Sequence, residues 1–237
     1  MDDVWISFPS RLSGQPVRLH GLWLAAEPEG GDRAGASPVL LYLHGAHYNV
    51  TGSAQRVRRM QELGFSVLAL DYRGFGKSDR SMPTEALAYE DARAAWNWLA
   101  AKYPKRQRYI FGHSLGGAIA IELASRVPDE AGTIVEGTFT SIPDVFSTMK
   151  WGWLPLGPLI TQRFSAIDRV AEMGSPLLVV HGTEDSLVRP ELGRRLYEAA
   201  RRPKAFVLVE GGSHHDTNAL GQAQYKQAIM QLFGLQG

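Results

Sequence analysis

The chain has 237 residues, no cysteine, and 25 Lys and Arg against 24 Asp and Glu, for a net charge of +1. This length suits one large α/β domain, since roughly 150 residues per domain is usual, and its core needs no disulfide or metal for stability. The near-zero charge excludes the basic surface that nucleic acid or an anionic membrane would need, and a hydrophobic content of 44% excludes a disordered chain.

The amino-terminal residues Met1–Trp5 lack the basic start and the apolar run of a signal peptide, which predicts a cytoplasmic protein. The most apolar stretch covers residues 151–160 and is interrupted by Gly and Pro residues. A helix that spans a bilayer takes about 20 apolar residues. We therefore expect no stable membrane insertion.

Apolar runs alternate with helix-like patterns along the chain, which is typical of βαβ units and a mostly parallel sheet. Val4–Phe8 and Val17–Ala25 flank a turn-rich segment, so we expect them to form an antiparallel hairpin at one edge. Buried parallel strands are expected at Val39–Leu43, Ser66–Leu70, Arg108–Phe111, Gly132–Val135, Leu177–Val180 and Ala205–Val209. Helices are expected at Ala54–Leu63, Thr84–Lys102, Leu115–Val127, Pro190–Ala200 and Asn218–Phe233.

A GxSxG motif, Gly112-His113-Ser114-Leu115-Gly116, joins the strand pattern Tyr109–Phe111 to a helix pattern. In this context the motif predicts a nucleophile elbow, a tight turn that lifts the Ser hydroxyl clear of the backbone. Glycines are needed two positions before and after the Ser because side chains there would collide with the neighbouring strand or helix. The sequence therefore predicts Ser114 as a nucleophile, with the backbone N–H of Leu115 as one donor to the oxyanion.

An activating acid is expected further along the chain, because a Ser hydroxyl is a poor nucleophile alone. Asp185 lies just beyond the strand pattern Leu177–Val180, and the carboxyl ends of parallel strands share the edge where open α/β folds place their sites. Its place in this loop favours Asp185 as the acid. Glu184 beside it and Glu136 after an earlier strand are the alternatives.

The base is expected in the loop after the last strand, which carries the neighbouring histidines His214 and His215. Adjacent side chains usually project in different directions, so only one of the two should reach the Ser. A second oxyanion donor is expected after the strand Val39–Leu43, where the small residues Gly45 and Ala46 follow. The backbone N–H of Ala46 is the candidate.

The segment from Phe139 to Val170 fits no simple βα unit and is rich in apolar residues. We interpret it as a short cap, with Phe139, Trp151 and Trp153 as walls of an acyl pocket, and with ordinary core packing as the alternative. Tyr48 is expected either to line the entrance of this acyl pocket or to lie on a surface loop.

Two other patterns are expected to be structural. Gly76-Lys77-Ser78 nearly matches a phosphate-binding loop, but Asp71 replaces the first Gly and would repel phosphate, so we expect a turn. No metal-binding motif is present. The histidines without an assigned role are expected to be structural: His20, His44, His47, His113 and His181.

These motifs together resemble those of α/β-hydrolase-fold serine hydrolases. They are His44-Gly45, Asp71–Ser78, Gly112–Gly117, His181–Asp185 and His214, in that family's order. The segments Gly137–Ile142 and Gly212–Asp216 are similar to a branch of small, nearly lidless hydrolases related to eukaryotic depalmitoylating serine hydrolases, although His215 departs from the Asn usual there.

The resemblance implies an eight-stranded, mostly parallel sheet flanked by helices. It also implies one α/β-hydrolase domain over residues 1–237 with a cap at 139–170, and a triad of nucleophile Ser114, acid Asp185 and base His214. We expect a carboxylic ester hydrolase that needs no cofactor or metal and takes a small-molecule ester with a small to medium acyl group. A thioesterase, a peptidase with the same triad and a non-enzymatic binding module are the alternatives.

Overall fold

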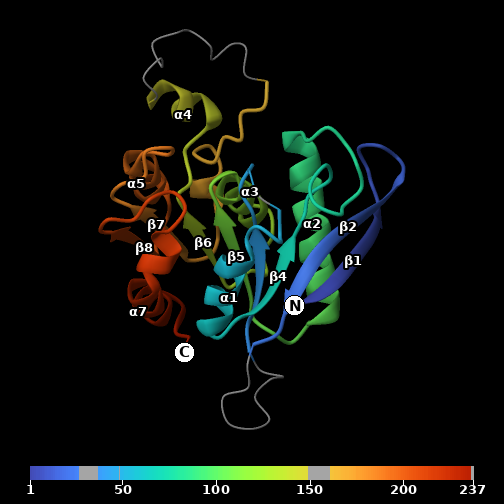
Figure 1. Ribbon diagram of the computed structural model, residues 1–237, viewed down its shortest axis with the longest axis horizontal. Coiled ribbons are helices and arrows are strands. Elements are labelled where there is room, and N and C mark those ends of the chain that lie inside the picture. Colours follow the sequence, from blue (N-terminus) through green and yellow to red (C-terminus); the bar gives the residue numbers. More distant parts are fainter. Residues whose placement is uncertain (27–36, 48, 149–160, 236–237) are drawn as a thin grey trace.

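The computed structural model describes residues 1–26, 37–47, 49–148 and 161–235 (Figure 1). Within these ranges, eight strands form one sheet in the order β1-β2-β4-β3-β5-β6-β7-β8. β1 (Asp2–Pro9) and β2 (Pro16–Leu24) form an antiparallel hairpin at one edge, and β2 also pairs antiparallel with β4 (Ser66–Leu70). The other neighbouring strands are parallel, so the predicted fold class is confirmed.

The parallel strands lie where the apolar runs predict them. The remaining ones are β3 (Val39–Leu43), β5 (Arg108–His113), β6 (Gly132–Glu136), β7 (Leu177–Gly182) and β8 (Lys204–Val209). β3, β4, β6 and β7 are buried along their whole length, as strands covered on both faces must be. β8, at the other edge, is largely half-buried.

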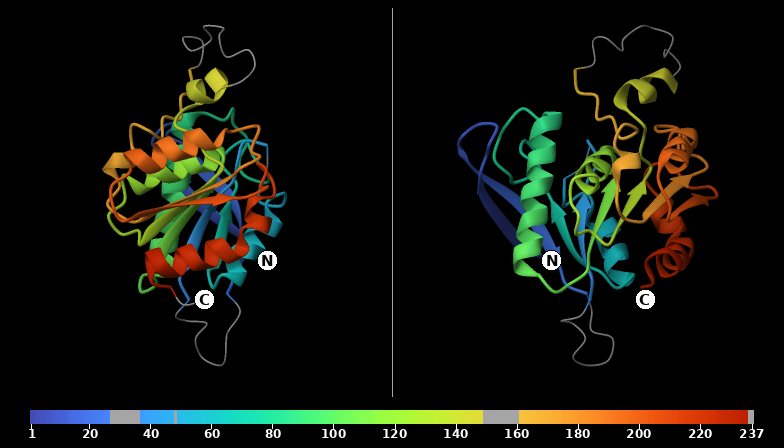
Figure 2. Two further views of the ribbon diagram at one scale, coloured as in Figure 1. Left: turned by 90° about the vertical axis from the view of Figure 1, so that its left-hand side faces the viewer. Right: turned by 180° about the vertical axis from the view of Figure 1, so that it is seen from behind.

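Helices cover both faces of the sheet (Figure 2). One hydrophobic cluster packs α2 (Glu85–Lys102), α3 (Leu115–Ala124) and α5 (Pro190–Ala199) against one face. A second cluster packs α1 (Ala54–Glu62) and α7 (Gln222–Phe233) against the other face. In the described ranges, no helix is long and apolar enough to cross a membrane.

The last predicted helix, Asn218–Phe233, is divided in the structure. α6 (Thr217–Leu220) is separated from α7 by the single residue Gly221. A Cβ at Gly221 would lie only 2.7 Å from the Val209 side chain, so this close approach to β8 favours glycine at the break.

The segment after β6 rises beyond the carboxyl ends of the parallel strands, where it forms α4 (Ile142–Thr148) (Figure 1). The chain returns beside its own start: Ile142 N–H donates to the Arg163 carbonyl at 2.9 Å, and Ile167 N–H donates to the Thr140 carbonyl at 3.0 Å. It then enters the short 3-10 helix η3 (Val170–Glu172). Residues 149–160, with the predicted pocket residues Trp151 and Trp153, lie outside the described residues.

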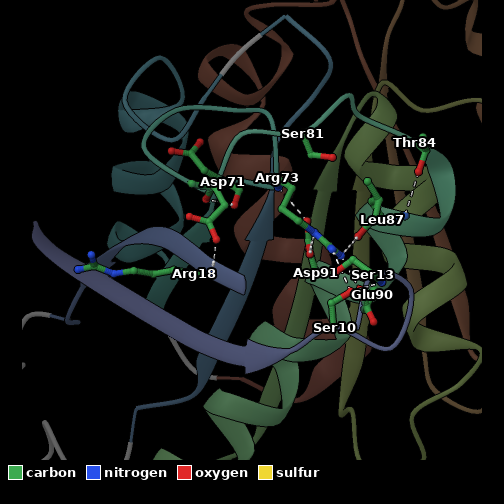
Figure 3. Close-up of polar contacts among 12 residues, drawn as sticks. Ser10, Ser13, Arg18, Asp71, Arg73, Ser81, Thr84, Leu87, Glu90 and Asp91 are labelled. Atoms are coloured by element: carbon green, nitrogen blue, oxygen red, sulfur yellow. Dashed lines mark hydrogen bonds and ion pairs between the residues drawn. The ribbon is translucent and has the colours of Figure 1, made fainter. Parts of the chain in front are cut away.

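Arg73 fixes the turn after β4 to α2 and to the β1–β2 turn (Figure 3). Its backbone N–H and Nε each donate to Asp91 of α2 at 2.8 Å. Nη2 donates to Glu90 at 2.5 Å, and Nη1 donates to Ser10 in the β1–β2 turn at 3.1 Å. The segment therefore acts as a structural clamp between the hairpin and α2, in keeping with the turn expected at residues 71–78.

Glu130, in the loop before β6, is a buried carboxyl with no cationic partner among the described residues. Ser175 and Thr133 hydroxyls donate to its Oε1, and Oε2 has no hydrogen-bond partner in the described ranges. Burial raises the pKa of Glu130 to about 7 from 4.5. The folded chain therefore holds a proton between these pH values that the unfolded chain releases, so stability falls as the pH rises through that window.

Replacing Glu130 by Gln (E130Q), which mimics the protonated form, is expected to remove this part of the pH dependence. At pH 8 the free energy of unfolding of the variant should be about 1–3 kcal/mol higher than that of the natural protein. At pH 5 the two free energies of unfolding should nearly agree. Urea unfolding at both pH values measures the difference. An equal gap between the two proteins at pH 5 and pH 8 would contradict the assignment.

Candidate active site

Ser114 occupies the turn between β5 and α3 in a conformation that residues other than glycine rarely adopt, with φ of +55°. Its N–H donates to the Glu136 carbonyl at 2.9 Å, and its carbonyl accepts from the Thr138 hydroxyl at 2.8 Å and the Gly117 N–H at 2.9 Å. Such a backbone persists only where neighbouring groups hold it in place. The side chain remains partly exposed at the carboxyl edge of the sheet.

The glycines of the GxSxG motif lie where side chains do not fit. A Cβ on Gly112 would overlap the backbone at Gly116, and a Cβ on Gly116 would overlap the Leu43 carbonyl of β3. The crossing of β5 and α3 beside β3 therefore needs both glycines, as the motif predicts.

Asp185 and His214 are directly hydrogen-bonded across the ends of β7 and β8. Asp185 Oδ2 lies 2.7 Å from His214 Nδ1, and the two residues are only 4% and 6% exposed. Asp185 Oδ1 accepts from the backbone N–H groups of Leu187 at 3.0 Å and Val188 at 2.8 Å. An ionised carboxylate only accepts, so His214 carries its proton on Nδ1 and presents Nε2 as an acceptor.

Asp185 is held in its ionised form. Burial would raise the pKa of its carboxyl, but hydrogen bonds from His181 and His214 outweigh burial and hold the pKa below its usual range. His181 Nε2 lies 2.8 Å from the Val188 carbonyl, to which it donates, and 3.4 Å from Asp185 Oδ2. His181 was expected to be structural, and its contact with Asp185 has no signal in the sequence beyond the spacing of four residues.

The side chains of the alternative residues do not form this pair. The Glu136 carboxylate accepts hydrogen bonds from Arg56 at 2.8 Å and from the Tyr225 hydroxyl. Glu184 and His215 are exposed. The hydrogen-bonded pair in this structure is therefore Asp185 with His214.

Gly137 lies at the end of β6, beside the hydrogen-bonded pair. It follows Glu136, whose carbonyl binds Ser114 N–H, and it has a φ of +55°. A Cβ at Gly137 would lie 3.3 Å from both Asp185 Oδ2 and His214 Nδ1. The end of β6 thus contacts both the Ser114 turn, through the Glu136 carbonyl, and the hydrogen-bonded pair, at Gly137.

The loop after β3 lies against the nucleophile on its other side. A Cβ at Gly45 would be 3.1 Å from Ser114 Cβ, and the next residue, Ala46, is exposed. Leu115 begins α3, so its N–H belongs to the first turn, whose N–H groups have no partner within the helix. These positions suit the two N–H groups expected to bind an oxyanion.

A pocket of about 360 Å³ opens beside Ala46, between the loop after β3 and the turn after β4. Its lining residues come from two short segments: Ala46, His47, Asn49 and Gly52, and Gly74, Phe75 and Gly76. Asp71 holds the two segments together, because its carboxylate accepts from Val50 N–H at 2.8 Å and packs against Gly76.

The predicted pocket walls are only partly described. Phe139 is 5% exposed and packs in the hydrophobic cluster on the side of α2 and α3. Tyr48 lies outside the described residues, like Trp151 and Trp153. No group of metal-ligating side chains is gathered in the ranges that the structure describes.

The mostly parallel eight-stranded sheet, with helices on both faces and a Ser turn after its central strand β5, defines an α/β-hydrolase fold. The sequence model of the serine aminopeptidase S33 family matches residues 35–166, and the chain belongs to this family.

Known proteins similar to this chain include hydrolases. An uncharacterized protein of Mycobacterium tuberculosis is 36% identical over 207 residues, which cover 86% of this chain and 70% of that protein. The lysophosphatidylserine lipase ABHD12 of Gallus gallus is 32% identical over 224 residues, covering 86% of this chain and 56% of that protein. The solved esterase Pf2001 of Pyrococcus furiosus has the same fold, with a TM-score of 0.75 and 21% identity over 98% of this chain and 91% of that one.

Proposed function

We propose that this α/β hydrolase cleaves carboxylic esters with a small to medium acyl group through an acyl-enzyme on Ser114. The observation that carries the proposal is the buried hydrogen bond between Asp185 and His214, beside a Ser whose backbone is held at positive φ. The names of the lipase and the esterase reported above support ester chemistry. The cytoplasmic location and the likeness to depalmitoylating hydrolases remain predictions.

In this mechanism the Ser114 hydroxyl attacks the ester carbonyl and gives its proton to His214 Nε2. Asp185 keeps the imidazole in the required tautomer and stabilises the imidazolium that forms. The backbone N–H groups of Leu115 and Ala46 bind the oxyanion, and losing one such donor typically costs about 10² to 10³ in kcat.

The second half of the reaction reuses the same residues. His214 returns its proton to the leaving alkoxide, and the alcohol departs. His214 then takes a proton from the water that attacks the acyl-enzyme. When the C–O bond to Ser114 breaks, His214 returns this proton to Ser114 Oγ, and the carboxylic acid is released.

The proposal is tested with p-nitrophenyl esters of increasing acyl length, comparing the natural protein with the variant Ser114→Ala (S114A). We expect turnover with short and medium esters that falls by about 10⁴-fold or more in the variant. Matched thioester and aminoacyl-anilide substrates test the thioesterase and the aminopeptidase alternatives. Faster turnover of either would replace the ester assignment, and no turnover of any substrate would favour a binding module.

A further inference from the structure

A buried ion pair lies beneath the loop that carries His214. Arg56, in the first turn of α1, donates from Nε to Glu136 Oε1 at 2.8 Å, and the two residues are 8% and 0% exposed. The Tyr225 hydroxyl of α7 donates to the other carboxylate oxygen, Oε2. Burial disfavours the charged guanidinium, but the Glu136 carboxylate, together with the neighbouring Tyr42 and Tyr225, raises the pKa of Arg56, which therefore stays charged.

The backbone of the His214 loop is bound to this pair. Arg56 Nη2 donates to the His215 carbonyl at 3.1 Å. The ring of His113 donates from Nε2 to the His214 carbonyl at 3.0 Å, and the same nitrogen lies 3.9 Å from Glu136 Oε1. Burial and the neighbouring Arg56 hold the pKa of His113 well below its usual value, so it is a neutral donor. Two consecutive carbonyls of the loop are thus fixed by buried donors.

Glu136 also contacts the nucleophile. Its backbone carbonyl accepts from Ser114 N–H at 2.9 Å, while its side chain holds Arg56. One residue at the end of β6 therefore connects the turn that carries Ser114 with the loop that carries His214. A change in the ion pair would move that loop relative to the Ser.

Stability alone is a poor explanation for this arrangement. Burying two charges costs several kcal/mol per ion, and well-packed apolar residues often replace a buried ion pair with no loss of stability. A guanidinium, however, presents several N–H donors in a fixed planar fork, which suits it to hold a carboxylate and a carbonyl at a set angle. In Arg56 that fork joins Glu136 to the His215 carbonyl.

We propose that Arg56, oriented by Glu136, is a positioning residue that sets the His214 loop against Ser114. The proposal rests on the proposed function, in which His214 is the base. Arg56 itself does not touch the reacting atoms, so its loss should lower kcat through the placement of the imidazole and leave KM nearly unchanged.

The test compares Arg56→Met (R56M) with two controls, using the p-nitrophenyl ester that the natural protein turns over fastest. Arg58→Met (R58M) changes an exposed arginine of the same helix, and Tyr225→Phe (Y225F) removes the other partner of Glu136 without touching the loop. We expect kcat to fall about 10- to 100-fold in R56M with KM within about twofold, and both controls to keep kcat within about threefold. Y225F should still unfold at a lower urea concentration, since it loses a buried hydrogen bond.

A second measurement does not depend on turnover. The proton on His214 Nδ1, which is hydrogen-bonded to Asp185, should give a downfield NMR signal in the natural protein and in Y225F, because it is protected from exchange with solvent. The signal should be absent in His214→Ala. We expect R56M to broaden or shift it. Arg56→Lys (R56K) keeps the charge beside Glu136 but not the planar fork, so it should also lower kcat. If R56M does not fold, R56K takes its place in the comparison.

Unchanged kcat and an unchanged signal in folded R56M or R56K would overturn the proposal. Equal losses of kcat in Y225F and R56M would do the same, because they would reduce the effect to general destabilisation. If the natural protein hydrolyses no ester, the proposed function fails, and the NMR signal alone decides whether Arg56 positions His214.

Discussion

Replacing His214 by alanine (H214A) is expected to lower kcat for ester hydrolysis by about 10⁴-fold or more, whereas His215→Ala (H215A) should leave it within about threefold. His214 is buried and bound to Asp185, while the His215 side chain is exposed, and the Arg56 contact uses its backbone carbonyl, which alanine keeps. Steady-state hydrolysis by the two variants, each checked for folding by circular dichroism, measures the difference.

The two neighbouring histidines make this a matched comparison, since the variants differ by one position in the same loop. A large loss in H215A with near-normal turnover in H214A would reverse the assignment of the base. Similar large losses in both would indicate that the loop, and not one imidazole, had been damaged.

Replacing Asp185 by Asn (D185N) is expected to lower kcat by about 10⁴-fold with little loss of structure. Asp185 Oδ1 accepts from two backbone N–H groups, so the Asn carbonyl must take that place and its NH₂ must face His214 Nδ1. An NH₂ group there forces Nδ1 to accept, which moves the imidazole proton to Nε2 and leaves no acceptor for the Ser114 hydroxyl.

The matched control is Glu184→Gln (E184Q), a change at the exposed carboxylate beside Asp185. It should keep kcat within about threefold, because Glu184 does not contact His214 in the described structure. Both variants are assayed with the same ester and at the same pH. A near-normal kcat in D185N, or a loss in E184Q as large as that in D185N, would transfer the role of the acid away from Asp185.

The strands were predictable because buried parallel strands are continuous apolar runs in the sequence, as β3 and β7 show. The break at Gly221 was not, since it follows from the close approach of β8, a contact distant in the sequence. α4 was missed because seven residues, none of them buried, carry too little periodic signal to distinguish a helix from a loop.

The contact between Asp185 and His214 was predictable to a similar degree. The loops at the ends of β5, β7 and β8 bring Ser, Asp and His to one edge because parallel strands share a direction. The role of Arg56 had no such signal: it stands among Arg58 and Arg59 in one helix, and only the packing of β6 and α7 shows which arginine is buried. Buried polar partners of this kind depend on tertiary contacts that no local pattern records.

The decisive experiment is to treat the natural protein and S114A with a fluorophosphonate, which phosphonylates an activated Ser, and to map the modified peptide by mass spectrometry. We predict one adduct per chain, on Ser114, and none in the variant. A folded natural protein that gains no adduct, or one whose adduct lies on another residue, would contradict the assignment of Ser114 as the nucleophile of a serine hydrolase.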